Sequence, residues 1–200
     1  MSNKIIVISR QFGSGGREIG KKLAEKLGID FFDLGIIEMA AKRSGSDYNE
    51  LLEVDEKKVG TKWYSFTAEA DAQYSLRKIP INENLFQIQK QIILDVAEKK
   101  SCVIIGRGAD YILKDKDKMM SVFVYADRET KLESIMRHYG LERSNALALM
   151  KKTDKQRRQY YNAYTEYSWG NMENYDLAIN RSKYGIEGAV DILEEAYRIL

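Results

Sequence analysis

The chain has 200 residues, of which 44% are hydrophobic and 31% are charged, and its formal net charge is +2. This composition describes one globular domain, or one domain with an inserted subdomain, and excludes a disordered chain. The small net charge excludes a polycation, so we expect no nucleic-acid partner. No apolar run reaches the length of a membrane span and no signal peptide is recognisable, so we expect no membrane association and a cytoplasmic location.

The first part of the chain predicts a strand, a turn and a helix. An apolar run at about 4–8 is typical of a buried strand. A glycine-rich turn leads from it into a helix that we expect to end at Gly28. A short strand is expected at 30–32. Residues 45–80 are polar and aromatic with weak periodicity, which favours a partly helical insertion over the sheet edge.

The rest of the chain continues the alternation of helices and strands. Its expected elements are, in order, a helix at 82–100, strands at 102–105 and 120–126, a helix from Asp127 to Gly140, a strand at 175–179 and a helix at 185–200. Asn82 or Asn84 is the expected N-cap of the first of these helices. The alternation predicts an α/β fold, a doubly wound five-stranded parallel sheet with helices on both faces.

The only cysteine and the only histidine argue against two kinds of site. Cys102 lies in an apolar run, which is typical of a small buried core residue. One cysteine cannot form a disulfide within the chain. His138 stands near the expected end of a helix, where a solvated side chain complements the helix dipole. A zinc site built from His and Cys is therefore not expected.

The turn "GSGGREIG" after the first strand is typical of a phosphate-binding loop. Gly13, Gly15 and Gly16 let the backbone approach a ligand closely, and the following helix contributes N–H groups and the positive end of its dipole. A plain tight turn is the structural alternative. A dinucleotide-binding loop, G-x-G-x-x-G, fits poorly because Glu18 occupies its third glycine.

The spacing also fits the mononucleotide loop G-x-x-x-x-G-K-[ST], but three of its letters differ. Arg10 occupies the first glycine, Gly16 the lysine and Arg17 the hydroxyl residue. The usual lysine supplies a cation and the usual hydroxyl supplies a magnesium ligand. Ser14 is a possible replacement for the hydroxyl, although the sequence does not give the direction of its side chain. The metal ligand therefore stays unknown.

Charged residues also follow two other expected strands. Asp33 comes directly after the strand at 30–32, and Arg107 comes just after the strand at 102–105. Ligands of open α/β sheets bind at the carboxyl ends of the strands, so we expect both residues to face one cleft and to bind an acceptor. The alternatives are a helix N-cap for Asp33 and a solvated surface charge for Arg107. The basic stretch 151–158 is either a solvated helix face or a lid that closes on phosphates.

With these residues in hand, the chain resembles the cytidylate kinase-like family, a divergent branch of the nucleoside monophosphate kinases. The resemblance covers nearly the whole chain, and the segments that carry it are "ISRQFGSGGREIGKKLAEKLG", "FFDLGIIEMAA", "VIIGRGADYIL", "VFVYADRETKLE", "DKQRRQYY" and "YDLAINRSKYGIEGAVDIL". It implies transfer of the γ-phosphoryl group of ATP, with Mg²⁺, to a nucleoside monophosphate such as CMP. It also implies a single domain whose core is 1–44, 81–150 and 171–200, with an acceptor-binding insert at about 45–80 and a lid at about 150–170.

The resemblance also assigns roles to particular residues. Asp33 stands where the family motif "DTG" carries an aspartate that helps to hold the nucleoside. Arg107 stands where "GRDIG" carries an arginine near the acceptor phosphate. Asp154 and Arg157 fit the lid pattern D-S-x-R, with Lys155 in place of the serine.

Phosphoryl transfer needs cations, and arginines close to the loop could replace the absent lysine. The loop candidates for nucleotide binding are Arg10, Gly13, Ser14, Gly15, Gly16 and Arg17, and the candidates for catalytic cations are Arg17, Lys155, Arg157 and Arg158. Gly16 would leave room for a guanidinium that enters from elsewhere. Our hypothesis is that the loop has moved its charge to Arg10 and Arg17. The alternative is that these arginines pair with Glu18 or another surface carboxylate.

The favoured function is therefore a nucleotide kinase that acts on a small phosphorylated acceptor. A catalytically weak nucleotide-binding module that senses or regulates is the first alternative, because the loop lacks its lysine and hydroxyl. A dinucleotide-binding oxidoreductase is the second. The sequence leaves the acceptor, the rate of turnover and the oligomeric state open.

Overall fold

The computed structural model describes residues 3–33 and 83–200. Its strands are β1 (Ile5–Arg10), β2 (Asp30–Phe32), β3 (Cys102–Ile105), β4 (Met119–Tyr125) and β5 (Leu177–Asn180). In the described part of the chain all five form one parallel sheet in the order β2-β3-β1-β4-β5. This confirms the expected five-stranded parallel sheet.

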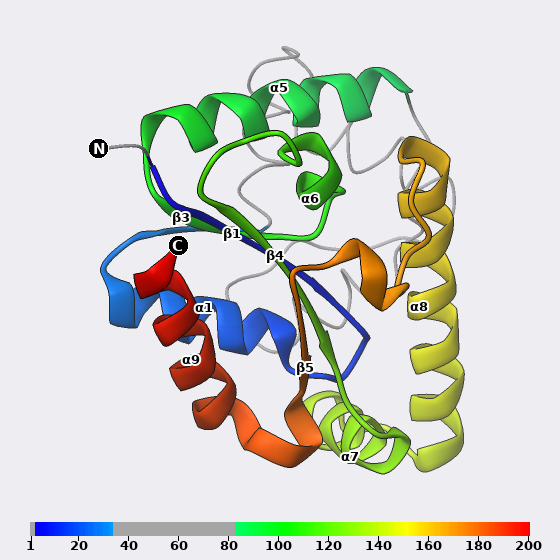
Figure 1. The fold of residues 1–200 in the computed structure, drawn as a ribbon. Helices are drawn as coiled ribbons and strands as arrows, with labels where there is room; N and C mark the ends of the chain where they lie inside the picture. The colour runs from blue at the N-terminus through cyan, green and yellow to red at the C-terminus, as the bar shows by residue number, and fades with distance from the viewer. Residues whose placement is uncertain (1–2, 34–82) are drawn as a thin grey trace.

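Helices cover both faces of the sheet (Figure 1). They are α1 (Gly16–Leu27), α5 (Glu83–Lys99), α6 (Ala109–Ile112), α7 (Arg128–Tyr139), α8 (Arg143–Tyr164) and α9 (Arg181–Ile199), with a short 3₁₀ turn at Met172–Asn174. Helices α1 and α9 lie on one face, and α5 and α6 lie on the other. None of these described helices is long and apolar enough to cross a membrane.

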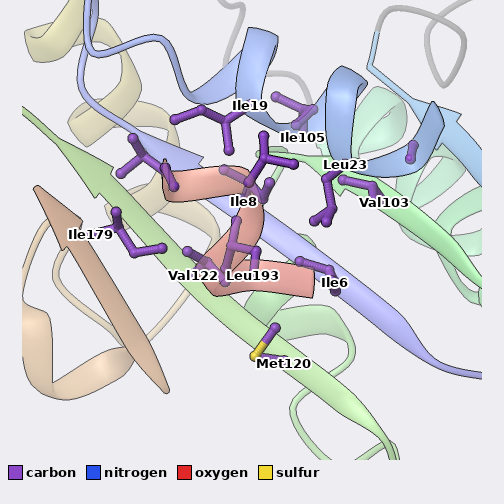
Figure 2. Packing of buried hydrophobic residues seen from close by; sticks show 14 residues of the cluster. Ile6, Ile8, Ile19, Leu23, Val103, Ile105, Met120, Val122, Ile179 and Leu193 are labelled. Atoms are coloured by element: carbon purple, nitrogen blue, oxygen red, sulfur yellow. The ribbon is translucent and has the colours of Figure 1, made fainter. Parts of the chain in front are cut away.

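Alternating residues of the central strand divide the core into two layers. Ile6 and Ile8 of β1 pack with Leu23 of α1 and Leu193 of α9 (Figure 2). Ile5 and Val7 of β1 belong to a second cluster with residues of α5 and α6. Successive side chains of a strand point to opposite faces, so a fully apolar strand fills both layers. Cys102 is buried in this second cluster, as expected, and burial raises the pKa of its thiol to about 12.

Two strands differ in extent from the sequence expectation. β1 continues beyond residue 8 because Ser9 and Arg10 still pair with β4. The last strand begins later than residue 175. The carboxylate of Asp176 accepts hydrogen bonds from the backbone N–H and the hydroxyl of Ser121, which places this residue before the ladder. The carboxyl end of β1 therefore lies closer to the glycine loop than the apolar run alone indicates.

Several predicted helix ends are confirmed. Gly28 and Gly140 end α1 and α7 in the left-handed conformation. The Asp127 carboxylate caps α7 by accepting a 2.8 Å hydrogen bond from the backbone N–H of Thr130. The expected final helix at 185–200 is present, and a helical segment that begins at Arg181 precedes it across a kink at Gly185, whose backbone is not helical. α5 begins at Glu83, so Asn84 lies inside the helix and is not its N-cap, and Asn82, the other candidate, lies outside the described residues.

Residues 151–164, which are rich in charge and tyrosine, form the greater part of a long helix, α8. α8 runs over 22 residues and buries the side chains of Ala146, Leu149, Met150, Thr153, Tyr160 and Tyr161. Its first half forms a third apolar cluster with α7 and with Phe12 of the glycine loop. The proposed lid at 150–170 corresponds to the second half of α8 and the turns after it. The proposed insert at 45–80 lies outside the described residues.

Candidate functional site

The glycine loop lies between β1 and α1 with its shape fixed from two sides. Gly13 and Gly15 both have a φ of 80°, which disfavours any residue with a side chain. A Cβ at Gly13 would lie 2.8 Å from the carbonyl oxygen of Lys131 in α7, and a Cβ at Gly15 would lie 2.7 Å from Cδ1 of Ile186 in α9. The loop therefore delivers the chain to the start of α1, where backbone N–H groups and the helix dipole favour an anion.

A pocket opens at this helix start. It is lined by Arg10, Gln11, Phe12, Gly13, Gly15, Gly16, Arg17, Glu18, Asp33, Ser134, Ile135, His138, Tyr139 and Arg157. These residues come from the loop, the end of β2, helix α7 and helix α8. Most residues of the predicted nucleotide site thus meet in one place. His138 is exposed, as expected, and it is also one of the residues that line the pocket.

Arg17 makes a close ion pair in this pocket. Its Nε lies 2.5 Å from Oδ2 of Asp33, whose side chain is only 6% exposed. Arg17 therefore pairs with a buried carboxylate, whereas Glu18 lies near Lys22 in its own helix. The pair joins the helix that follows the glycine loop to the carboxyl end of β2, where we expect the acceptor to bind.

Arg157 links α8 to the same loop. Its Nη1 donates a 3.1 Å hydrogen bond to the carbonyl oxygen of Arg10, and its guanidinium carbon lies 5.5 Å from the centre of the Phe12 ring. The backbone N–H of Phe12 donates a 2.7 Å hydrogen bond to Oδ1 of Asp154. The two residues that match the lid pattern thus both hold the loop.

Burial and charge oppose each other around these side chains. Burial, and after it the nearby charge of Arg10, lower the pKa of Arg157 to about 9, while Asp154 and Asp33 oppose the shift. Burial raises the pKa of Asp154, and the charge of Arg157 opposes that shift. An anion bound beside Arg10 and Arg157 would offset the repulsion between the two guanidinium groups.

Ser14 does not face the pocket. Its hydroxyl lies 2.8 Å from the carbonyl oxygen of Gln11 and 3.0 Å from that of Val124, and its side chain is fully buried. The residue ties the loop to β4 and cannot serve as the metal ligand in this arrangement. No group of three or more His, Cys, Asp or Glu side chains in the described ranges could hold a metal ion.

Three other predicted site residues lie outside the pocket lining. Arg107 follows β3 with a φ of 60° and lies beside Tyr160, whose pKa burial raises to about 12 against the opposing Arg107 charge. Lys155 is exposed on α8. The guanidinium carbon of Arg158 lies 5.7 Å from the centre of the Trp169 ring. Among the lid cations, the structure brings Arg157 to the loop and leaves Lys155 and Arg158 apart from it.

Sequence reasoning missed several residues that shape the pocket. The Phe12 ring stacks on that of Tyr139 with centroids 5.7 Å apart, and Gln11 accepts a 2.8 Å hydrogen bond from Nζ of Lys131. An aromatic residue inside a glycine loop was the available signal for packing against a neighbouring helix. The partner helix α7 could not be identified without the fold.

Comparison with known proteins agrees with this geometry. A family model described as the cytidylate kinase-like family matches residues 5–183. A cytidylate kinase from Archaeoglobus fulgidus is 27% identical over 97% of this chain and 94% of its own length. A cytidylate kinase from Pyrococcus horikoshii is 24% identical over 96% of this chain and 87% of its own length.

Solved structures resemble the whole chain. An uncharacterized protein from Eubacterium ventriosum is 30% identical with a TM-score of 0.73, over 98% of this chain and 99% of its own. Shikimate kinase from Bacteroides thetaiotaomicron, 15% identical with a TM-score of 0.54 over 98% of both chains, shares the fold. Because the family model spans most of its length and the parallel sheet carries a glycine loop at the start of α1, the chain belongs to the cytidylate kinase-like family.

Proposed function

We propose that this protein transfers a phosphoryl group from ATP to a small phosphorylated acceptor, a nucleoside monophosphate such as CMP. The observation that carries the proposal is the pocket at the start of α1, where the glycine loop meets Arg10, Arg17 and Arg157. Phosphoryl transfer depends mainly on positioning and on neutralising charge, and this pocket supplies both. Membership in the cytidylate kinase-like family supports the same reaction.

In this proposal the backbone N–H groups of residues 13–17 bind the phosphates of the donor. Arg157 approaches from α8 and neutralises charge on the group that moves. Arg17 links the donor site to Asp33, which with Arg107 belongs to the acceptor site. Mg²⁺ would neutralise further charge on the donor phosphates. Since Ser14 is turned inward, the ion would rest on phosphate oxygens and water and not on that hydroxyl.

A coupled assay of ADP release across a set of nucleoside monophosphates tests the proposal. We expect multiple turnovers with at least one monophosphate, with CMP as the first to try, and little ADP release without an acceptor. Arg157→Met should lower kcat/KM by about a hundredfold or more, because one charged contact to the moving group typically contributes about 2.7–4 kcal/mol. Lys155→Met is the matched control from the same helix and should change kcat/KM little, since its side chain is exposed.

A second candidate function is a nucleotide-binding module that senses or regulates without efficient turnover. The observation that favours it is Gly16 at the position of the usual lysine, where Arg10 fills the adjacent space. Saturable ATP binding without multiple turnover on any monophosphate would select this candidate. Saturable NADH binding would instead favour the dinucleotide-binding oxidoreductase.

A further inference from the structure

The geometry points to Arg10 as the phosphate-binding cation of this loop, in a reciprocal exchange with Gly16. The mononucleotide loop pattern has glycine at the position of Arg10 and lysine at the position of Gly16. This chain has a cationic residue, Arg10, at the first of these positions and a glycine, Gly16, at the second. The inference rests on the proposed function for the identity of the ligand, a nucleoside triphosphate.

The space around Gly16 shows why both positions must change together. A Cβ at Gly16 would lie 2.6 Å from Cβ and 3.1 Å from Cγ of Arg10, and 3.3 Å from Cβ of Val124. The aliphatic stem of Arg10 thus occupies the space in which a side chain at position 16 would begin. A lysine at Gly16 and an arginine at position 10 exclude each other.

A second glycine receives the far end of the same side chain. Gly106 follows β3 with a φ of 66°, and a Cβ there would clash with Nη1 of Arg10 and lie 3.5 Å from its Cζ. Arg10 therefore extends from the end of β1 across to the end of β3, next to Arg107. Its guanidinium lies between the glycine loop and the strand end where the acceptor is proposed to bind.

The electrostatic surroundings of Arg10 favour an anion. Arg157 donates a hydrogen bond to the Arg10 carbonyl oxygen, and the charge of Arg10 adds to the burial that lowers the pKa of Arg157. Asp33 is held by Arg17, and Asp154 lies 4.0 Å from Nη1 of Arg157 while it also accepts from the loop backbone. A triphosphate would place negative charge where these guanidinium groups meet. The planar fork of arginine can contact two phosphate oxygens at once, which a lysine cannot do in the same way.

Calorimetric titration of ATP into single and double variants of the full chain tests the exchange. Arg10→Met keeps a stem beside Gly16 and removes the charge, so we expect at least a tenfold loss of ATP affinity and a weaker dependence of affinity on salt. Arg198→Met, at the exposed end of α9, is the control and should bind ATP as the wild type does. Gly16→Lys should also lose affinity, because the stem of Arg10 blocks the new side chain.

The double variant Arg10→Gly with Gly16→Lys restores the first glycine and the lysine of the ordinary loop pattern and leaves Arg17 at the third differing position. We expect its ATP affinity to return to within about threefold of the wild type, although each single change lowers it. Should Arg10→Met fail to fold, the ATP affinities of Gly16→Lys and of the double variant are enough to test the exchange. Wild-type affinity in Arg10→Met, or tighter binding in Gly16→Lys than in the double variant, would overturn the exchange.

Binding is measured here without turnover, so the two proposals fail in different ways. A wild-type protein that binds ATP but phosphorylates no monophosphate contradicts the kinase function, while the affinities of the variants still decide the role of Arg10. Wild-type ATP affinity and normal turnover in the Arg10→Met variant would contradict the exchange and leave the kinase function standing.

Discussion

At the scale of single residues, Asp110 is a buried carboxyl group with a raised pKa. Asp110 of α6 is 4% exposed, and its Oδ2 accepts a 2.6 Å hydrogen bond from the hydroxyl of Tyr161 in α8. Burial raises the pKa of Asp110, and the Tyr161 hydrogen bond only partly opposes the shift. Tyr161 lies one helical turn after Arg157, so this contact helps to set the position of that cation.

The raised pKa of Asp110 predicts a specific dependence of stability on pH. The folded protein holds a proton on this carboxyl more tightly than the unfolded chain does, so the contribution to stability is full below the ordinary pKa of an aspartate. It is lost as the pH rises through the raised value. Asp110→Asn keeps a neutral acceptor for Tyr161 and should therefore gain stability relative to the wild type as the pH rises above the ordinary pKa of an aspartate.

Urea unfolding of both proteins at several pH values measures this difference. The exposed Asp115→Asn variant is the control, and its difference from the wild type should show no such rise. A constant difference between wild type and Asp110→Asn would mean that the Asp110 carboxyl titrates normally in the folded state.

Residue identities were easier to predict than side-chain directions. The glycine spacing located the loop, and Gly16 indicated space for a guanidinium, but in the structure the aliphatic stem of Arg10 fills that space and its guanidinium lies at Gly106. The inward direction of Ser14 depends on a carbonyl oxygen of β4, far away in the sequence. Arg157 and Lys155 are two positions apart on one helix and so point in different directions. The sequence could not choose between them.

At the scale of elements, aromatic rings join α8 to α5. The rings of Tyr164 and Phe86 stack with centroids 4.2 Å apart and an interplanar angle of 7°. Tyr160 adds an edge contact to Phe86 and donates a 2.9 Å hydrogen bond to Gln89. These contacts fix the end of α8 opposite to the end that packs on α7.

A double-mutant cycle on Phe86→Leu and Tyr164→Leu should reveal the stacked pair. We expect a coupling of about 0.5–1.5 kcal/mol in the free energy of unfolding, beyond the loss from each single change. Phe86→Leu combined with Tyr139→Leu, which removes a separate ring contact, should be additive within about 0.5 kcal/mol. Additivity in the first cycle would show that the stack contributes only through buried area.

The predictability of the elements followed their composition. Strands with continuous apolar runs were located well, because parallel strands buried on both faces carry little else. α8 was recognised only as a charged, tyrosine-rich stretch, since polar residues interrupt its buried face. The short helical segment before Gly185 was not predicted, because this glycine interrupts the helix after its first turn.

At the scale of the whole molecule, the parallel sheet collects distant residues at one edge. Arg10 ends β1, and Asp33 and Arg107 come just after β2 and β3, so all three lie at the carboxyl ends of neighbouring strands. Alternation of strands and helices was enough to predict this edge, because parallel strands of one sheet place their carboxyl ends together. The approach of Arg157 was not predictable in the same way, since it depends on how α8 packs beside the sheet.

Ligand binding at this edge should stabilise the whole domain. ATP at about 100 times its dissociation constant should add about 2.7 kcal/mol, which raises the melting temperature of a domain of this size by about 5–10 °C. Scanning calorimetry with and without ATP measures the shift. Arg157→Met should show a smaller shift at the same ATP concentration, whereas an equal shift would place the nucleotide away from α8.

The packing of the glycine loop between α7 and α9 has a consequence for the rate at which a ligand binds. Contacts at Gly13 and Gly15 hold the loop in shape from both sides before any ligand arrives. Binding then needs no slow ordering step, and the entropy of fixing this backbone has already been lost during folding. The observed association rate should therefore rise in proportion to ATP concentration, without a plateau, as it does when encounter and orientation alone limit binding.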